Sequence, residues 1–246
     1  MKMNELLTHT FKALRRQLGH DRSRDQRPMW QRRLSADSDF CRALVSCGFL
    51  TGEQMQRAAE RYRLGRSRDG GVIFWQIDQM ETVCDGKIMY YRQDCHRDHQ
   101  RHPNWVSYLL KRSGQLPEEF KSEHCLFGLH LLAGDYTVAV VESEKTAVIM
   151  SELYPDYLWL ASGGLYELTA QKLFPLHGRR IVLFPDTDTE GKTYATWYRV
   201  TVEARQLLGH PVYLSPLLEQ QATKEQKAAK IDIVDFCFSK TTGLFI

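Results

Sequence analysis

Two aspartates that could hold a metal ion stand one residue apart in the C-terminal half of the chain. Asp186 and Asp188 follow the apolar run of residues 181–184 and a turn at Pro185. Such a run is typical of a strand buried on both faces. Carboxylates this close raise each other's pKa, and Mg²⁺ removes that cost while keeping waters for a phosphate-bearing substrate. The alternative is that both aspartates shape the turn and cap the next helix.

Two further stretches place chemistry-bearing residues after strands. Glu142 ends the apolar run of residues 137–141, and a helical pattern begins directly after it. Residues 158–165 form a third predicted strand with a turn at Gly163 and Gly164, and Gly191 follows the aspartate pair. This alternation of strands and helices predicts an α/β fold with a mostly parallel sheet and right-handed crossovers. Active sites in such sheets lie beyond the carboxyl ends of the strands, so we expect these acids to converge there.

The order strand-Glu-helix, strand-Gly-Gly, strand-Asp-x-Asp-helix resembles the Toprim domain of topoisomerases and DnaG-type primases. The resemblance covers roughly residues 134 to 240. It implies a Rossmann-like sheet with flanking helices and catalytic, metal-binding roles for Glu142, Asp186 and Asp188. A fourth strand is expected within residues 210–216, after a helix over residues 190–208. Asp232 and Asp235 resemble a late acidic motif of primases, which makes them second-tier residues, either metal-binding, as we expect for Asp232, or architectural; alternatively both lie on the outside of a final helix.

The first motif departs from the usual primase pattern. Primases place Gly after the catalytic Glu, and this chain has Ser143. The stretch with Glu144, Lys145 and Thr146 looks more like the Toprim variants of plasmid and mobile-element primases. Lys145 at a helix N-terminus could hold a phosphate or neutralise a neighbouring acid. Glu144 competes with Glu142 for the metal, and Glu142 is preferred because it directly follows the apolar run.

Residues 67–133 contain pieces of a small mixed subdomain. Residues 71–78 and 85–92 are predicted as strands, with a turn signal at Asp85-Gly86. Their order with the segments 104–110 and 126–132 resembles the subdomain that precedes Toprim in DnaG-type primases. The resemblance makes Arg92, Lys111 and Arg112 candidates for contacting template or nucleotide phosphate. The alternative for each is surface solubility.

Residues 1–66 are expected to form a basic helical region, followed by the subdomain of residues 67–133 and the Toprim domain of residues 134–246. Thr51 and Gln54 have the spacing of a helix capping box. Basic helices can hold phosphate backbones, although an ordinary solvated face explains any single arginine equally.

Composition limits the class of protein. The 246 residues are 43% hydrophobic with a formal net charge of +3, so a packed core is expected. Six cysteines without a regular framework favour a reduced, cytoplasmic setting, and the sequence contains neither a signal peptide nor a membrane-length apolar run. The Cys- and His-rich residues 95–102 fit no standard zinc pattern, so no zinc is expected.

The resemblance as a whole implies a primase-like protein of a mobile element that acts in replication or mobilisation. Its cofactor would be Mg²⁺ or Mn²⁺, and its expected partners are single-stranded DNA, nucleoside triphosphates and a helicase or other mobile-element replication protein, with no membrane. Two other readings stay open: a non-catalytic DNA-binding Toprim protein, favoured by the missing zinc module, and a metal-dependent Toprim nuclease.

Overall fold

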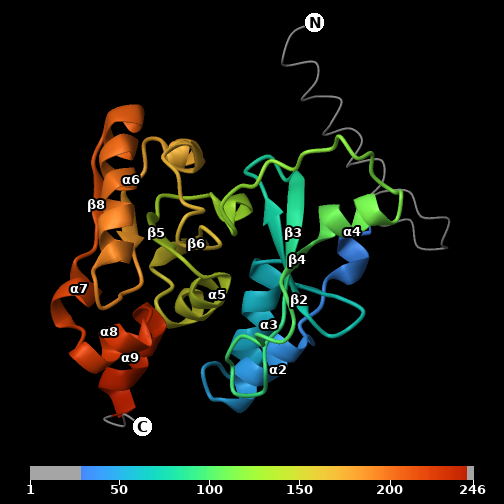
Figure 1. Ribbon diagram of the computed structural model, residues 1–246, viewed down its shortest axis with the longest axis horizontal. Coiled ribbons are helices and arrows are strands. Elements are labelled where there is room, and N and C mark those ends of the chain that lie inside the picture. Colours follow the sequence, from blue (N-terminus) through green and yellow to red (C-terminus); the bar gives the residue numbers. More distant parts are fainter. Residues whose placement is uncertain (1–28, 243–246) are drawn as a thin grey trace, which may run out of the picture. The chain divides into compact units, whose positions relative to one another are not determined.

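The computed structural model describes residues 29–242 (Figure 1). The chain divides between Cys125 and Leu126 into two compact units, which are described separately. The predicted helical patterns before residue 29 therefore lie outside the described residues. Within the described part of the chain, every helix is too short or too polar to span a bilayer.

The first unit is built on an antiparallel sheet. Its strands pair in the order β1-β2-β3-β4, and its helices precede and follow them. The elements are η1 (Gln31–Arg33), α2 (Asp39–Ser46), α3 (Gly52–Arg61), β1 (Gly65–Arg66), β2 (Val72–Ile77), β3 (Val83–Met89), β4 (Asn104–Trp105) and α4 (Val106–Arg112). The domain boundary predicted near residue 66 would separate α2 and β1 from β2. In the structure, β1 pairs with β2 and α2 packs on β2, so these elements belong to one unit.

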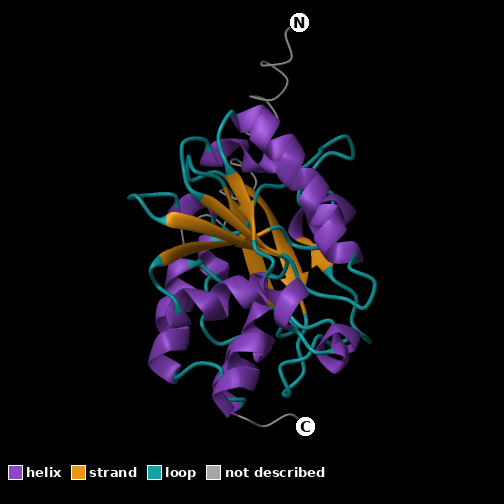
Figure 2. Ribbon diagram, turned by 90° about the vertical axis from the view of Figure 1, so that its left-hand side faces the viewer, coloured by secondary structure: helices purple, strands orange, loops and turns teal. Residues whose placement is uncertain are grey.

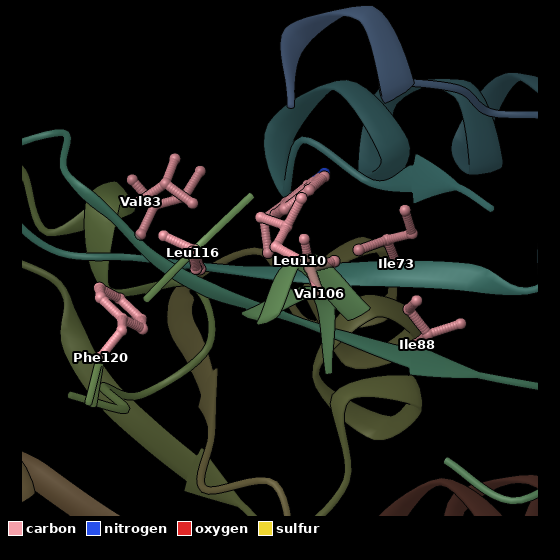
Figure 3. Close-up of a cluster of buried hydrophobic side chains, with 9 residues drawn as sticks. Ile73, Val83, Ile88, Val106, Leu110, Leu116 and Phe120 are labelled. Atoms are coloured by element: carbon pink, nitrogen blue, oxygen red, sulfur yellow. The ribbon is translucent and has the colours of Figure 1, made fainter. Parts of the chain in front are cut away.

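The strand β2 is buried along its whole length because both of its faces are covered. Alternate side chains of a strand point to opposite faces. Ile73 and Trp75 join an apolar cluster with Val106 and Leu110 of α4 (Figure 3). On the other face, the ring of Phe74 lies 5.3 Å from that of Phe40 in α2. This double coverage explains the unbroken apolar run in the sequence.

The expected capping box at α3 is confirmed. The Thr51 side chain accepts a hydrogen bond from the backbone N–H of Gln54, whose side chain accepts one from the N–H of Thr51. These bonds satisfy backbone donors that the first turn of a helix leaves without partners.

The expected turn at Asp85-Gly86 is wrong. Both residues lie inside β3, and the hairpin turn comes earlier, where Asp78 accepts backbone hydrogen bonds from Met80 and Thr82. Gly86 is in the strand because the ring of Trp75 packs against it: a Cβ at this position would lie 2.7 Å from two ring carbons. The pair marks a close approach between strands, which sequence alone does not distinguish from a turn.

The second unit contains a parallel sheet in the order β6-β5-β7-β8, which confirms the predicted α/β fold class. Figure 2 shows the strands inside and the helices around them. The elements are η2 (Leu129–Leu131), β5 (Thr137–Val141), α5 (Glu144–Leu153), β6 (Tyr157–Ala161), η3 (Gln171–Leu176), β7 (Ile181–Phe184), α6 (Lys192–Leu208), β8 (Val212–Leu214), α7 (Leu217–Gln221), α8 (Lys224–Ala229) and α9 (Ile233–Thr242).

The connections determine which face each helix covers. The chain moves from β5 to β6 in one direction and from β6 to β7 and β8 in the other. Right-handed crossovers therefore put α5 on one face and both η3 and α6 on the opposite face. The observed packing agrees, because α6 contacts η3 whereas α5 contacts α9. Helices α5 and α6 both begin at the carboxyl edge of the sheet.

Candidate metal and nucleotide site

The three predicted carboxylates, together with that of Glu190, line one cavity at the carboxyl edge of the parallel sheet. Glu142 follows β5 directly, and Asp186 and Asp188 follow the neighbouring strand β7. The cavity has a volume of about 440 Å³, and all three residues line it. The structure thus brings together the acids that the sequence separates by 44 residues, because neighbouring parallel strands end at the same edge.

The glycine turn after β6 holds the end of β5 in place. Gly163 has a positive φ of 91° and donates its backbone N–H to the carbonyl of Glu142 at 2.9 Å. Ser162 likewise donates its N–H to the carbonyl of Val141 at 3.0 Å. Gly164 continues this turn, and Gly191 adopts a φ of 64° just before α6. The predicted turn glycines therefore fix the loops that carry the acids.

The carboxyl group of Asp186 is surrounded mainly by other acidic side chains. Burial raises the pKa of its carboxyl group well above the usual value, and the negative charges of Asp232, Glu142 and Asp235 raise it further. The Lys145 ammonium acts in the opposite direction. A buried acid among like charges is stabilised by a cation, so this position suits a hard divalent ion.

Asp188 is in a different electrostatic state because it caps α6. Its Oδ2 accepts the N–H of Thr193 at 2.7 Å, and its Oδ1 accepts those of Glu190 and Lys192 at 2.8 and 3.1 Å. Burial alone would raise its pKa, but the hydrogen bonds from Thr193, Glu190 and Lys192 lower it to about 2. The capping role considered from the sequence therefore applies to Asp188, which also stays ionised beside the cavity.

The side chains do not form a ready-made metal cage. Among residues 29–242, no three His, Cys, Asp or Glu side chains are grouped closely enough to hold a metal ion by themselves. Mg²⁺ needs no such cage, because it is commonly bound by one or two carboxylates together with waters and substrate phosphates. The donor set at this cavity, with oxygen ligands and excess negative charge, fits such an ion.

The competing glutamate and the late acidic motif occupy other positions. Glu144 is buried at the start of α5 and does not line the cavity. Asp232 is also buried: its Oδ2 accepts the hydroxyl of Thr146 at 2.5 Å, and its Oδ1 accepts the N–H of Asp235 at 2.9 Å. Asp232 therefore caps α9 and links it to α5, and the alternative that it lies on the outside of a helix is wrong.

Sequence reasoning missed seven residues that line the cavity: Leu165, Thr187, Thr189, Glu190, Lys192, Thr193 and Lys230. Lys192 is the first residue of α6, where the helix macrodipole disfavours a cation, and that misfit was a readable signal. Its Nζ lies 5.9 Å from the ring centroid of Tyr166, whose hydrogen bond raises the pKa of the lysine. Thr187 and Lys230 gave no signal in the sequence.

The predicted basic contacts lie in the first unit. Arg92 forms a two-pronged ion pair with Asp94 in the loop after β3, at 2.7 and 3.3 Å. Lys111 donates to the carbonyl of Glu118 at 2.8 Å, and the Arg112 guanidinium lies 5.9 Å from the ring centroid of Tyr108. Lys145 lies in the first turn of α5, in the second unit. Phosphate binding by these four residues stays a prediction.

Comparison with solved structures finds a likeness to bacteriophage T7 primase. One match is the crystal structure of the primase fragment of the T7 primase-helicase protein, with 16% identity, a TM-score of 0.47 and coverage of 76% of this chain and 67% of that one. Another is a chain from a structure of the T7 lagging-strand DNA polymerase interacting with primase domains bound to an RNA/DNA hybrid and dTTP. It has 17% identity, a TM-score of 0.47 and coverage of 77% and 81%.

Comparison with curated proteins finds no match. A protein family described as a domain of unknown function, DUF6371, matches residues 38–187. The matched segment is more than half of the chain and contains both Glu142 and Asp186. The chain therefore belongs to the DUF6371 family.

Proposed function

We propose that this chain is a primase-like Toprim protein that carries out metal-dependent nucleotidyl transfer on a single-stranded DNA template, in replication or mobilisation of a mobile element. The observation that carries the proposal is the convergence of Glu142, Asp186 and Asp188 on one cavity at the carboxyl edge of a parallel sheet. The excess negative charge around Asp186 supports the use of a cation there.

In this proposal Asp186 and the ionised Asp188 are the principal ligands that would hold Mg²⁺ or Mn²⁺, and Glu142 is a further ligand or a proton acceptor. When bound, the ion would neutralise charge on the triphosphate and on the phosphoryl group being transferred. Asp232 has a supporting role, because its two oxygens already hold Thr146 and Asp235.

The transfer itself joins two substrates. A bond forms between the 3′-hydroxyl oxygen of the growing chain and the α-phosphorus of a nucleoside triphosphate, and the bond from that phosphorus to the pyrophosphate leaving group breaks. The hydroxyl proton must leave at the same time, and Glu142 is the carboxylate at the cavity that we assign as ligand or proton acceptor. Lys192 at the mouth of the cavity adds a positive charge for the phosphates.

The test is primer synthesis on single-stranded DNA with labelled nucleotides and Mg²⁺ or Mn²⁺. We expect labelled product from the wild-type chain and its loss, by at least about 100-fold, in Asp186→Asn, because removing a charge-stabilising group typically costs this much. Asp156→Asn is the matched control: Asp156 is an exposed acid in the same unit, just before β6. Full activity of Asp186→Asn would overturn the assignment.

One observation favours a second candidate, a non-catalytic DNA-binding protein. The carboxylate of Asp188 is committed to capping α6, and the described residues contain no ready-made metal group. For this candidate the same assay gives no product, while single-strand binding persists and weakens with salt. Shortened template in the same lanes would instead identify the nuclease. The main proposal also includes the expected partners: single-stranded DNA, nucleoside triphosphates and a helicase or other replication protein.

A further inference from the structure

The end of α8 has an unusual residue at a strained position. Lys230 adopts φ 55° and ψ 51°, the left-handed conformation. Its N–H donates to the carbonyl of Lys227, and the N–H of Ile231 donates to that of Gln226. This pair of bonds is the Schellman motif, in which Gly is the usual residue because a Cβ is disfavoured in this conformation. A lysine therefore occupies a backbone position at which glycine is the usual residue.

The strained turn is held against the acidic loop. The carbonyl of Ile231 accepts the backbone N–H of Thr187 at 3.1 Å, and Thr187 lies between Asp186 and Asp188. The next residue, Asp232, is bonded to Thr146 of α5. Lys230 therefore has a fixed backbone position at the rim of the cavity, and its exposed side chain lines that cavity.

Lys230 is not used as a structural counter-ion. It makes no ion pair with any residue in the described part of the chain, whereas Lys227 on the same helix pairs with Glu219 at 2.8 Å. The cation that lowers the pKa of Asp186 is Lys145. Arg63 takes the same left-handed position after α3 but is used structurally, in an ion pair with Glu81, whereas Lys230 lies beside the carboxylates of the cavity without such a pair among the described residues.

A second observation at the same cavity points to a ligand. Thr187 is only 2% exposed, and its hydroxyl lacks a hydrogen-bond partner among the described residues. Buried hydroxyl groups are normally hydrogen-bonded, and Thr187 lines the cavity. A polar group inside the cavity would provide the missing partner.

We propose that Lys230 binds a phosphate group of the substrate at this cavity, with the hydroxyl of Thr187 as a second hydrogen-bonding group. The inference rests on the proposed function, because the three acids repel a free phosphate and the metal must offset them. The phosphate could belong to the incoming nucleoside triphosphate or to the nucleic-acid backbone, and both bear the oxygen atoms that a lysine ammonium binds.

The test measures affinity and stability in the same variants. Binding of a non-hydrolysable nucleoside triphosphate and of a labelled single-stranded oligonucleotide is measured separately, each with Mn²⁺. Lys230→Gly should weaken binding of one probe about tenfold or more, as expected for one lost charge-assisted hydrogen bond. Its melting temperature should be unchanged or higher by up to about 4 °C, because glycine relieves the strain. The probe that is weakened identifies the source of the phosphate.

Three controls separate a binding role from other causes. Lys230→Arg keeps the charge and should retain most of the affinity. Lys224→Ala removes a charge from the exposed start of α8, away from the cavity, and should leave both affinities unchanged. Thr187→Val should weaken the same probe as Lys230→Gly, by about fivefold or more, without a loss of stability.

The outcomes distinguish the inference from the function on which it rests. Equal affinities of wild type and Lys230→Gly for both probes, while Asp186→Asn loses metal-dependent binding, would overturn the inference and leave the proposed function intact. Absence of metal-dependent binding in the wild-type chain would overturn both. A lower melting temperature with unchanged affinity would make Lys230 a structural residue.

Discussion

Asp85, inside a strand of the antiparallel unit, and Asp186, just after a strand of the parallel unit, are buried aspartates with opposite electrostatic environments. Asp85 accepts hydrogen bonds from the N–H of Gly86 and from both the N–H and the hydroxyl of Ser107. His124 lies 3.4 Å from the same carboxylate and stacks on Trp105. Burial alone would raise the pKa of Asp85, but these hydrogen bonds from His124, Ser107 and Gly86 lower it.

Asp186 has the reverse environment. Its pKa is raised by burial and by three neighbouring acids, with one lysine opposing them. A carboxylate surrounded by donors holds its surroundings together, as Asp85 links β3, α4 and the segment that carries His124. A carboxylate surrounded by acids is repelled by them, which lowers the stability of the folded state unless a bound cation offsets the repulsion. The two carboxylates therefore differ in their partners: those of Asp85 stabilise its negative charge, whereas those of Asp186 oppose it, as we expect for the acid that we propose binds a cation.

The largest effect on stability should come from Asp85. Replacing it by Asn removes the buried negative charge that these donors stabilise, and it forces the hydroxyl of Ser107 to accept from the amide NH2 instead of donating to a carboxylate oxygen. We expect a loss of about 2–4 kcal/mol in the free energy of unfolding, the range for breaking a buried, charge-assisted network. Urea unfolding measures it. A loss below about 0.5 kcal/mol would mean that the network around Asp85 contributes nothing net.

The same variant should change the response to acid. Because the folded pKa of Asp85 lies below the value of about 3.9 for an unfolded aspartate, its stabilisation is fully present above about pH 4 and is lost as the pH falls through the folded pKa. The difference in stability between wild type and Asp85→Asn should therefore be constant from pH 5 to 7 and shrink below about pH 4.

A smaller effect of opposite sign should come from Asp186. In the presence of a chelator, Asp186→Asn should be more stable than wild type by about 0.5–2 kcal/mol, because functional sites are held at the expense of stability. Adding Mn²⁺ should raise the melting temperature of the wild-type chain and leave that of the variant unchanged. A variant less stable than wild type in chelator would place Asp186 in the same class as Asp85.

The smallest effect separates the two tasks of Asp188. Asn keeps one of the two oxygens that accept the N–H groups of Glu190, Lys192 and Thr193, so Asp188→Asn should lower the free energy of unfolding by about 0.5–1 kcal/mol, whereas Asp188→Ala keeps neither oxygen and should cost about 1–2 kcal/mol. Both variants remove the negative charge and should bind Mn²⁺ more weakly. Equal Mn²⁺ affinity in Asp188→Asn and wild type would show that Asp188 only caps α6.

Sequence patterns were sufficient to predict the strands of the parallel sheet and the acids that follow them, because these features depend on local patterns of apolar residues. Apolar runs that end in Glu142 and in Asp186 predict strands, and parallel topology makes their carboxyl ends meet. The capping box at Thr51 was equally readable, since its partners are three residues apart. Each of these signals is local, and each was found.

The rest depended on contacts between distant segments. Asp85-Gly86 has the composition of a turn, and only the ring of Trp75 explains a glycine inside the strand. Asp232 acquires its role from Thr146, which is 86 residues away. Lys230 is found only from its backbone conformation, because lysine has no tendency to be left-handed. No periodicity in the sequence encodes these three relations.

The hydrogen bond from Thr187 to Ile231 also sets an order of events during synthesis. Glu142 and Asp186 leave the ribosome before the segment that closes their loop, by a few seconds at roughly 5–20 residues per second. A nascent chain that stops short of Ile231 can form all four strands of the parallel sheet, yet it lacks both the carbonyl that holds Thr187 and the carboxylate that holds Thr146. The contacts that hold Thr187 and Thr146 are therefore the last parts of this site to be synthesised.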